Sequence, residues 1–255
     1  MPVAGKVVVV VMPAYNASKT LLETYNDIPK EFVDEIILVD DSSRDDTVRL
    51  AKEIGIKTFV HPRNIGYGGN QKTCYREALK AGAEIVIMLH PDYQYDPKKI
   101  PQIIAPIVEG RASLVLGSRI MGGGALNGGM PIWKYIANRF LTFIMNLVLK
   151  KRLSEYHTGY RAYSKEFLET IPFGLNSDDF VFDAEIIIQC VNLDFKIGEI
   201  EVSTIYRNDS SCIDFISSLR YGFGILRALW QYILHKNGLV RQSYLMRQQE
   251  GCSNE

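Results

Sequence analysis

The sequence has few cysteines, no excess of charge and no hydrophobic run long enough to cross a membrane. Its four cysteines include no Cys-x-x-Cys pair, so neither a disulfide framework nor a zinc cluster is expected. Lysine and arginine together number 29, as do aspartate and glutamate, which excludes a global positive field for nucleic acid. No window of about eighteen apolar residues is free of charge, and no signal peptide is evident. These absences predict a cytoplasmic protein that does not bind nucleic acid.

Hydrophobic residues are abundant, at 47% of the 255 positions, so the chain can form a large core. In the first half, short apolar runs alternate with segments of helical periodicity. Strands are expected at 7–12, 35–41, 57–62, 84–89 and 113–118, and helices at 18–28, 43–54, 68–81 and 97–108. This alternation predicts an α/β fold with a mostly parallel sheet flanked by helices, in which ligands bind beyond the carboxyl ends of the strands.

The second half has longer helical segments. The glycine-rich segment 120–131 is expected to be a mobile loop, and the polar tail from residue 241 is expected to fray. Helices are expected at 133–149, from Lys165 and at 178–191, a strand at 195–207, and an amphipathic helical region at 212–235. We therefore predict one main domain at residues 1–210 and a C-terminal extension of amphipathic helices at 211–255.

Polar side chains follow the predicted strands at the points where these end. Asp40 and Asp41 end the second strand, and the fourth strand stops at His90, which is followed by Asp92. Carboxylates that converge at one edge of a sheet repel one another unless a cation lies between them. A divalent cation that holds a diphosphate meets this need, because it takes hard oxygen ligands and few of them from the protein. Asp96, before a proline, is instead typical of a helix cap.

Seven segments resemble, in order and spacing, the motifs of family 2 glycosyltransferases between about residues 6 and 210: "MPAYNA", "VDDSSRDDT", "RNIGYGGNQ", "HPDYQYDP", "GSR", "HTGYRAYS" and "FVFDAEI". Within that family they look like the polyprenyl-phosphate sugar transferases, which include dolichol-phosphate mannose synthase. The resemblance implies a GT-A (Rossmann-like) fold and a divalent cation, Mn²⁺ or Mg²⁺. It also implies inverting transfer from a nucleotide-sugar donor, GDP-mannose or a UDP-sugar, to a polyprenyl phosphate.

In that family the fourth strand ends in Asp-x-Asp followed by x-Gln, and here this frame contains His90, Asp92 and Gln94. The resemblance implies that Asp92 binds the metal directly and that Gln94 assists it. His90 replaces the first aspartate, and it either supplies a nitrogen ligand or only forms hydrogen bonds nearby. If His90 binds the metal, the site is expected to shift toward manganese, because imidazole suits transition metals better than magnesium.

The resemblance also implies that Pro13, Tyr15, Val39 and Asp41 line the nucleoside pocket. The flat ring of Tyr15 suits a base, and the carboxylate of Asp41 suits a base N–H or a ribose hydroxyl. In "RNIGYGGNQ", the glycines around Gly68 form a turn whose N–H groups can approach a phosphate or ribose. A purely structural role for these glycines is the alternative.

Several charged residues match family positions on the reacting side. Arg207 matches an arginine near the diphosphate, and Arg119 and Lys134 match positions that bind the acceptor phosphate. A lipid phosphate is already an anion and needs no strong base. A hydroxyl acceptor requires a carboxylate base, for which Asp183 and Glu185 are the candidates. Residues two apart on a helix point in different directions, so only one is expected to face the site, and we favour Asp183.

Two helical segments, 133–149 and the amphipathic region at 212–235, suggest a membrane surface. In 133–149, a narrow polar stripe interrupts an otherwise mostly apolar circumference, and it contains Lys134, Asn138, Thr142 and Asn146. The cations at 150–152 suit anionic lipid headgroups. We therefore expect peripheral association with the cytoplasmic face of a membrane. The alternatives are an ordinary core helix, or an interface with a second copy or with a membrane protein.

The sequence thus predicts a metal-dependent enzyme that transfers a sugar to a polyprenyl phosphate. A glycosyltransferase that uses a saccharide or another hydroxyl acceptor in glycan biosynthesis is one alternative. A relative that binds nucleotide sugar without catalysis is the other, and the histidine at position 90 keeps it open.

Overall fold

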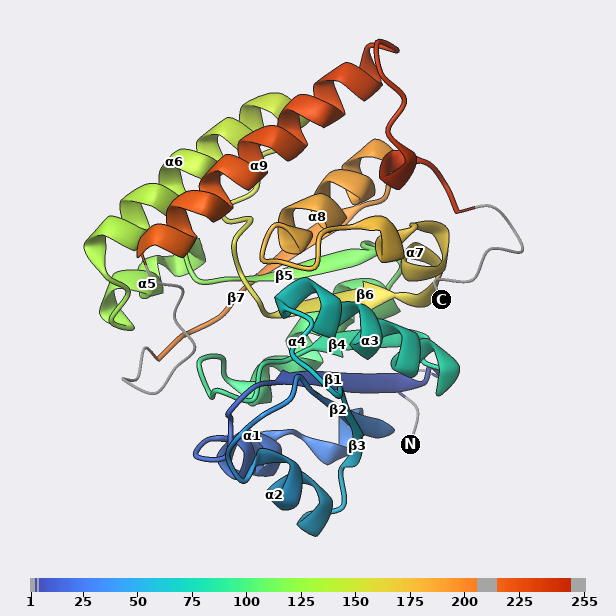
Figure 1. The fold of residues 1–255 in the computed structure, drawn as a ribbon, viewed down its shortest axis with the longest axis vertical. Helices are drawn as coiled ribbons and strands as arrows, with labels where there is room; N and C mark the ends of the chain where they lie inside the picture. The colour runs from blue at the N-terminus through green and yellow to red at the C-terminus, as the bar shows by residue number, and fades with distance from the viewer. Residues whose placement is uncertain (1–2, 4, 206–214, 249–255) are drawn as a thin grey trace.

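The structure is a computed structural model, which describes residues 3, 5–205 and 215–248 (Figure 1). The described residues form one seven-stranded sheet with the order β3-β2-β1-β4-β6-β5-β7. The strands are β1 (Val8–Ala14), β2 (Glu35–Asp40), β3 (Lys57–Val60), β4 (Ile85–Met88), β5 (Leu114–Ser118), β6 (Arg161–Ser164) and β7 (Ile197–Glu201). All pairings are parallel except those of β6 with its neighbours β4 and β5.

Helices cover both faces of this sheet (Figure 1). The α-helices are α1 (Leu21–Asp27), α2 (Thr47–Glu53), α3 (Tyr67–Lys80), α4 (Ile100–Val108), α5 (Gly124–Asn127), α6 (Ile132–Leu149), α7 (Lys165–Thr170), α8 (Phe182–Asn192) and α9 (Phe215–Lys236). The 3₁₀-helices are η1 (Lys30–Phe32), η2 (Pro97–Lys99), η3 (Met121–Gly123), η4 (Phe173–Leu175) and η5 (Ser243–Leu245).

Strand β1 shows why the sheet is buried on both sides. All seven of its residues are buried, and successive side chains of a strand point to opposite faces. Val9 and Val11 therefore join the core formed with α3, α7, α8 and α9, whereas Val8 and Val10 join the core formed with α1, α2 and α4. The predicted mostly parallel α/β sheet is confirmed.

Strand β6 was not predicted. It has only four residues, and the first of them, Arg161, is fully buried rather than apolar. The strand follows a long excursion of the chain through α5 and α6 and then returns antiparallel between β4 and β5. Its return brings the residues just before Arg161 next to the end of β4.

The described residues differ from two expectations, one about the loop at 120–131 and one about the tail from residue 241. The glycine-rich segment 120–131 contains two short helices, η3 and α5, rather than irregular chain. The tail does not fray at η5, where Tyr244 and Leu245 are buried and their carbonyls accept hydrogen bonds from Gln189 and Asn192 of α8. Asp96 does cap η2, as predicted, because its carboxylate accepts a hydrogen bond from the Lys98 N–H at 2.9 Å. The domain boundary at residue 210 lies outside the described residues and stays a prediction.

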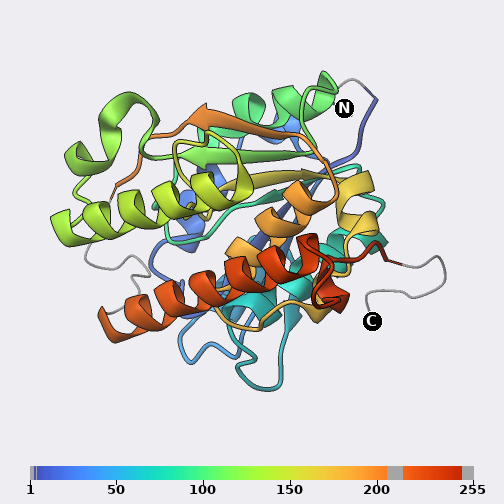
Figure 2. The same cartoon turned by 90° about the horizontal axis from the view of Figure 1, so that it is seen from above.

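The two longest helices, α6 and α9, lie side by side beyond the β5 and β7 end of the sheet (Figure 2). Helix α6 is turned so that its polar stripe faces inward, with Asn138 and Thr142 buried. Its outer side exposes a run of large apolar side chains, Ile132, Ile136, Phe140, Phe143 and Leu147, each more than 60% exposed. Helix α9 also exposes large apolar side chains, Leu219, Phe223, Leu226 and Trp230. Within the described part of the chain, no helix is long and apolar enough to span a membrane.

Candidate active site

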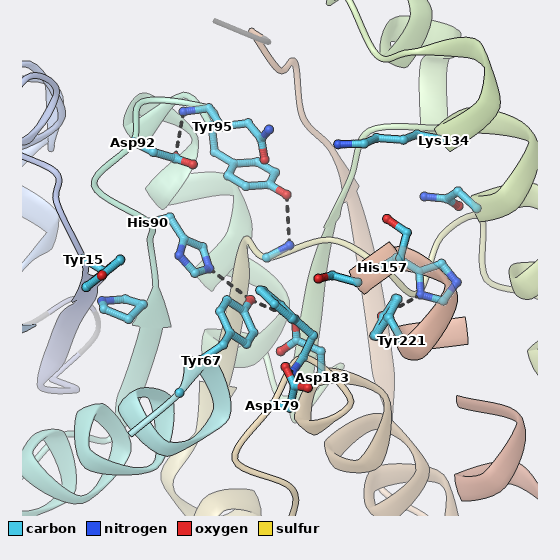
Figure 3. A pocket seen from close by; sticks show the side chains of 18 of the residues that line it. Tyr15, Tyr67, His90, Asp92, Tyr95, Lys134, His157, Asp179, Asp183 and Tyr221 are labelled. Atoms are coloured by element: carbon cyan, nitrogen blue, oxygen red, sulfur yellow. Dashed lines mark hydrogen bonds between the residues drawn. The ribbon is translucent and has the colours of Figure 1, made fainter. Parts of the chain in front are cut away.

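A cavity of about 620 Å³ lies at the carboxyl ends of β1, β2 and β4 and extends beneath α6 and α9 (Figure 3). One end holds Tyr15 after β1, and the other holds Lys134 of α6 and Tyr221 of α9. Nine of the predicted site residues line this cavity: Pro13, Tyr15, Asp41, His90, Asp92, Gln94, Arg119, Lys134 and Asp183. The structure therefore brings residues from both halves of the chain into one site. Arg207 lies outside the described residues, and its role stays a prediction.

Val39 and Gly68 are not among the residues that line the cavity. Val39 is fully buried, and its side chain packs in the core. The N–H of Gly68 donates to the carbonyl of Asp178 at 2.8 Å, so it is already occupied. A Cβ at position 68 would clash with the carbonyl of Ser177 and lie 2.8 Å from the Cβ of Phe182. This close approach explains the glycine structurally, which was the alternative to a phosphate-binding role.

Asp41 lines the cavity, but its carboxylate also organises the neighbouring loop. One of its oxygens lies 2.9 Å from His61 Nδ1 and accepts the N–H of Ile65 at 2.9 Å, and the other accepts the N–H of Gly66 at 3.1 Å. A carboxylate has about four acceptor positions, so room for one ligand hydrogen bond remains. The loop that carries Gly66 is thus held against the end of β2.

The turn after β4 presents Asp92 and Gln94 to the cavity. Both residues are 9% exposed, and the carboxylate of Asp92 accepts the N–H of Gln94 at 3.0 Å. Tyr93 between them has a φ of 54°, in the left-handed region that costs a non-glycine residue about 1–2 kcal/mol. The strained residue lets its two neighbours face the same space.

A hydrogen-bonded network fills the floor of the cavity below this turn (Figure 3). The Tyr67 hydroxyl lies 3.2 Å from His90 Nε2 and donates to Asp183 Oδ2 at 2.9 Å. Asp183 Oδ1 accepts from Gln71 at 3.1 Å and lies 3.3 Å from the fully buried guanidinium of Arg161. Burial is the main cause that lowers the pKa of His90 below its ordinary value. This imidazole is therefore neutral near pH 7.

Glu185, the other candidate base, is not among the cavity-lining residues. Its carboxylate accepts the N–H of Ser177 at 2.6 Å, and burial raises its pKa. Helical spacing thus separates the two acidic residues of α8, and Asp183 is the one that lines the cavity, as expected.

The far end of the cavity contains cations and a second histidine. Arg119 pairs with the fully buried carboxylate of Glu155, which also accepts a hydrogen bond from Asn138 of α6 at 2.7 Å. Lys134 projects toward the cavity from the start of α6, with its ammonium 5.3 Å from the ring of Trp133 (Figure 3). The polar stripe of α6 therefore faces the site.

His157 and Tyr221 connect this end of the cavity to α9. His157 Nδ1 lies 2.9 Å from the Tyr221 hydroxyl, and Nε2 is buried without a partner in the described residues. Burial lowers the pKa of His157 to about 4. The neutral ring is thus held between the sheet and the outer helix.

Comparison with known proteins identifies the family. The sequence profile described as glycosyl transferase family 2 matches residues 9–171. The chain belongs to this family. A UDP-N-acetylglucosamine–dolichyl-phosphate N-acetylglucosaminyltransferase of Methanococcus voltae is 29% identical over 220 residues, which cover 80% of this chain and 87% of that relative. An uncharacterised protein of Methanocaldococcus jannaschii is 34% identical over 197 residues, which cover 77% of this chain and 81% of the relative.

Solved structures show the same fold. Glucosyl-3-phosphoglycerate synthase of Mycobacterium tuberculosis, in complex with Mn²⁺, UDP and glucosyl-3-phosphoglycerate, superposes with a TM-score of 0.69. The two chains are 20% identical, and the match covers 90% of this chain and 80% of the other. The protein is therefore a glycosyltransferase with the GT-A fold predicted from its motifs.

A divalent cation fits the donor set of this glycosyltransferase. His90, Asp92 and Gln94 line the same cavity and offer one nitrogen, one carboxylate and one amide oxygen. Within the described ranges no three His, Cys, Asp or Glu side chains are grouped to hold a metal. Further ligands would thus come from a diphosphate and water, which is typical of cations that bind nucleotide substrates.

Three site residues of the glycosyltransferase were missed in the sequence. Tyr67 lies within the quoted glycine motif, but its contact with Asp183 spans 116 positions. His157 begins the motif "HTGYRAYS", and only the return of β6 places it at the cavity. Tyr221 lies in the predicted outer helix, and the spacing of apolar residues does not indicate that one tyrosine turns inward.

Proposed function

We propose that the protein transfers a sugar from a nucleotide-diphosphate-sugar donor, a UDP-sugar or GDP-mannose, to a polyprenyl phosphate at a membrane surface. The observation that carries this proposal is the orientation of α6. Its polar stripe faces the cavity, and its outer face exposes five large apolar side chains. A soluble acceptor needs no such surface, whereas a lipid acceptor requires the site to lie at a bilayer.

The two ends of the cavity suit the two substrates. We assign the nucleoside to the end with Pro13, Tyr15 and Asp41, and the acceptor phosphate to the end with Arg119 and Lys134. The relative from Methanococcus voltae is named for a UDP-sugar donor and a dolichyl-phosphate acceptor, which supports this assignment.

The reaction would replace one glycosidic bond by another. An oxygen of the acceptor phosphate attacks the anomeric carbon of the sugar with inversion, and the bond to the nucleoside diphosphate breaks. The acceptor is already an anion, so no proton has to be removed from it. A divalent cation at Asp92, with Gln94 in support, would neutralise the charge that develops on the leaving diphosphate. Arg207, which lies outside the described residues, is proposed to assist it.

The hydroxyl-acceptor alternative is weaker, because Asp183 is poorly suited to act as a base. Both of its oxygens already face donors of the protein, the Tyr67 hydroxyl on one side and Gln71 and Arg161 on the other. A carboxylate committed to these partners has less capacity to accept a proton from a substrate hydroxyl.

The test is a transfer assay with labelled UDP-sugars and GDP-mannose, Mn²⁺ or Mg²⁺, and a short polyprenyl phosphate, followed by organic extraction. Label in the organic phase is expected, and Lys134→Gln should reduce it at least tenfold. Lys52→Gln is the matched control, because Lys52 is exposed on α2 and is not among the cavity-lining residues. Release of nucleoside diphosphate with label only in water would contradict the lipid acceptor.

Membrane binding is tested separately by sedimentation with phosphatidylcholine vesicles that contain phosphatidylglycerol. Replacing Phe140 and Phe143 of α6 by serine should weaken binding at least tenfold, because each buried apolar side chain contributes about 1.5–3 kcal/mol. Leu22→Ser is the control, since Leu22 is 47% exposed on α1, at the other end of the molecule (Figure 1). If the wild-type protein does not bind vesicles but dimerises through α6, this face is an interface with a second copy rather than a membrane-binding surface.

A further inference from the structure

The two ring nitrogens of His90 have different surroundings. Nε2 lies 3.2 Å from the Tyr67 hydroxyl, whereas Nδ1 has no hydrogen-bond partner in the described part of the chain. A Cβ at Gly159 would lie 2.9 Å from both Cδ2 and Nε2 of His90, so this ring position depends on the glycine. In Figure 3 the ring stands between Tyr67 and the side of the cavity where Tyr15 lies. Nδ1 is therefore the nitrogen available to a ligand.

The direction of the hydrogen bonds fixes which nitrogen carries the proton. One oxygen of the Asp183 carboxylate accepts an N–H of Gln71 and forms an ion pair with Arg161, and a carboxylate paired with a guanidinium can only accept hydrogen bonds at its other oxygen. The Tyr67 hydroxyl donates to that other oxygen at 2.9 Å. A hydroxyl has one proton, and with this proton committed it can only accept from His90. His90 Nε2 must therefore be the N–H of the neutral ring.

We propose that Tyr67 is a positioning residue that holds His90 in the Nε2–H tautomer, which leaves the Nδ1 lone pair free to bind the metal next to Asp92. Histidines that bind metals usually donate their second ring N–H to another group, which fixes the tautomer. Here that group is a tyrosine, which Asp183 orients in turn. The inference rests on the metal dependence in the proposed function.

This arrangement gives the histidine at position 90 a defined role. An aspartate there would bind metal through either oxygen and would need no partner to select one. A histidine binds through one nitrogen only when the other carries the proton. The requirement for the Tyr67 hydroxyl should thus exist only while residue 90 is a histidine.

The variant Tyr67→Phe removes the hydroxyl and keeps the aromatic ring, which lies 4.6 Å from Phe180 and 5.5 Å from His90 between ring centroids. Mn²⁺ binding is measured by electron paramagnetic resonance at pH 7.5 with UDP and with GDP, and pulsed spectra detect a coordinated histidine nitrogen. The wild type should show this nitrogen, and His90→Asp should lose it. Tyr67→Phe should raise the Kd for Mn²⁺ by about 10–100-fold.

The double variant Tyr67→Phe with His90→Asp distinguishes a role of Tyr67 in positioning His90 from a role in the stability of the fold. In the His90→Asp background, Tyr67→Phe should change the Kd by no more than about twofold. Tyr156→Phe is the matched control, because it removes the hydroxyl of a fully buried tyrosine that donates to Asn146 at 2.9 Å, and neither residue is among those that line the cavity. The inference about Tyr67 would be overturned if the wild type bound Mn²⁺ without a coordinated histidine nitrogen, or if Tyr67→Phe changed the Kd for Mn²⁺ equally in both backgrounds. Neither result would overturn the proposed function. No Mn²⁺ binding by the wild type would overturn the proposed metal dependence as well.

Discussion

Replacing His157 by glutamine should remove a pH dependence from the stability of the fold. The ring is held between Tyr221 of α9 and the end of the cavity that contains Arg119 and Lys134, and burial lowers its pKa from 6.5 to about 4. The nearby charges act in both directions, since Glu155 raises this pKa and Arg119 and Arg161 lower it. The folded protein therefore disfavours the protonated ring.

The sign and the size of this pH dependence follow from the linkage between proton binding and folding. Between pH 6.5 and 4 the unfolded chain binds a proton at His157 that the folded chain does not, so stability rises with pH in this window. The contribution is fully present above pH 6.5 and is lost as the pH falls toward 4. A difference of about 2.5 pH units corresponds to roughly 3 kcal/mol as an upper limit.

The assay is urea unfolding at several pH values from 7 to 4.5, compared between the wild type and His157→Gln. Glutamine can still bond to the Tyr221 hydroxyl but does not titrate. Burial raises the pKa of Glu185, so its contribution has the opposite sign, but it is the same in both proteins and cancels. The wild type should lose about 2–3 kcal/mol more than the variant over this range. Parallel curves would refute the argument, and His235→Gln controls for the substitution itself.

Three further predictions concern the site and the packing. Asp92→Ala should abolish the effect of Mn²⁺ on nucleotide binding in calorimetry, and an affinity that EDTA lowers equally in wild type and variant would contradict this. Arg161→Met should destabilise the fold by about 3–5 kcal/mol in urea, because it leaves the buried Asp183 without its cation; a loss below about 1 kcal/mol would argue against that pairing. Gly68→Ala should cost at least about 2 kcal/mol, since its Cβ meets backbone, whereas Gly124→Ala, with open space around it, should be nearly neutral; equal melting temperatures would contradict the clash.

The parallel part of the sheet could be predicted because its strands are continuous apolar runs. Strand β4 has the sequence Ile-Val-Ile-Met, and all four residues are buried. A short apolar run of this kind is typical of a buried strand. Strand β6 could not be predicted in the same way. It begins at Arg161, which is buried because its guanidinium donates to the carbonyls of Thr158 and Asp183, and such contacts are set by the tertiary fold.

The residues of the candidate site also differ in whether a local sequence pattern could predict them. His90, Asp92 and Gln94 are neighbours in the sequence, so their motif indicated a site. Tyr67 and Asp183 meet only because α3 and α8 pack on the same face of the sheet, and no local pattern encodes that meeting. The outward apolar face of α6 was expected from its stripe, but which side would face the cavity depended on the buried Glu155.

The antiparallel strand β6 has a consequence for the growing chain during synthesis. Until residues 161–164 emerge, β4 can pair only with β1, and its other side is an open edge of apolar residues. Such edges pair readily with other chains, so nascent chains that stop near residue 150 should aggregate rather than fold. We therefore expect the part of the chain that carries β1 to β4 to fold only when residues up to at least β6 are present.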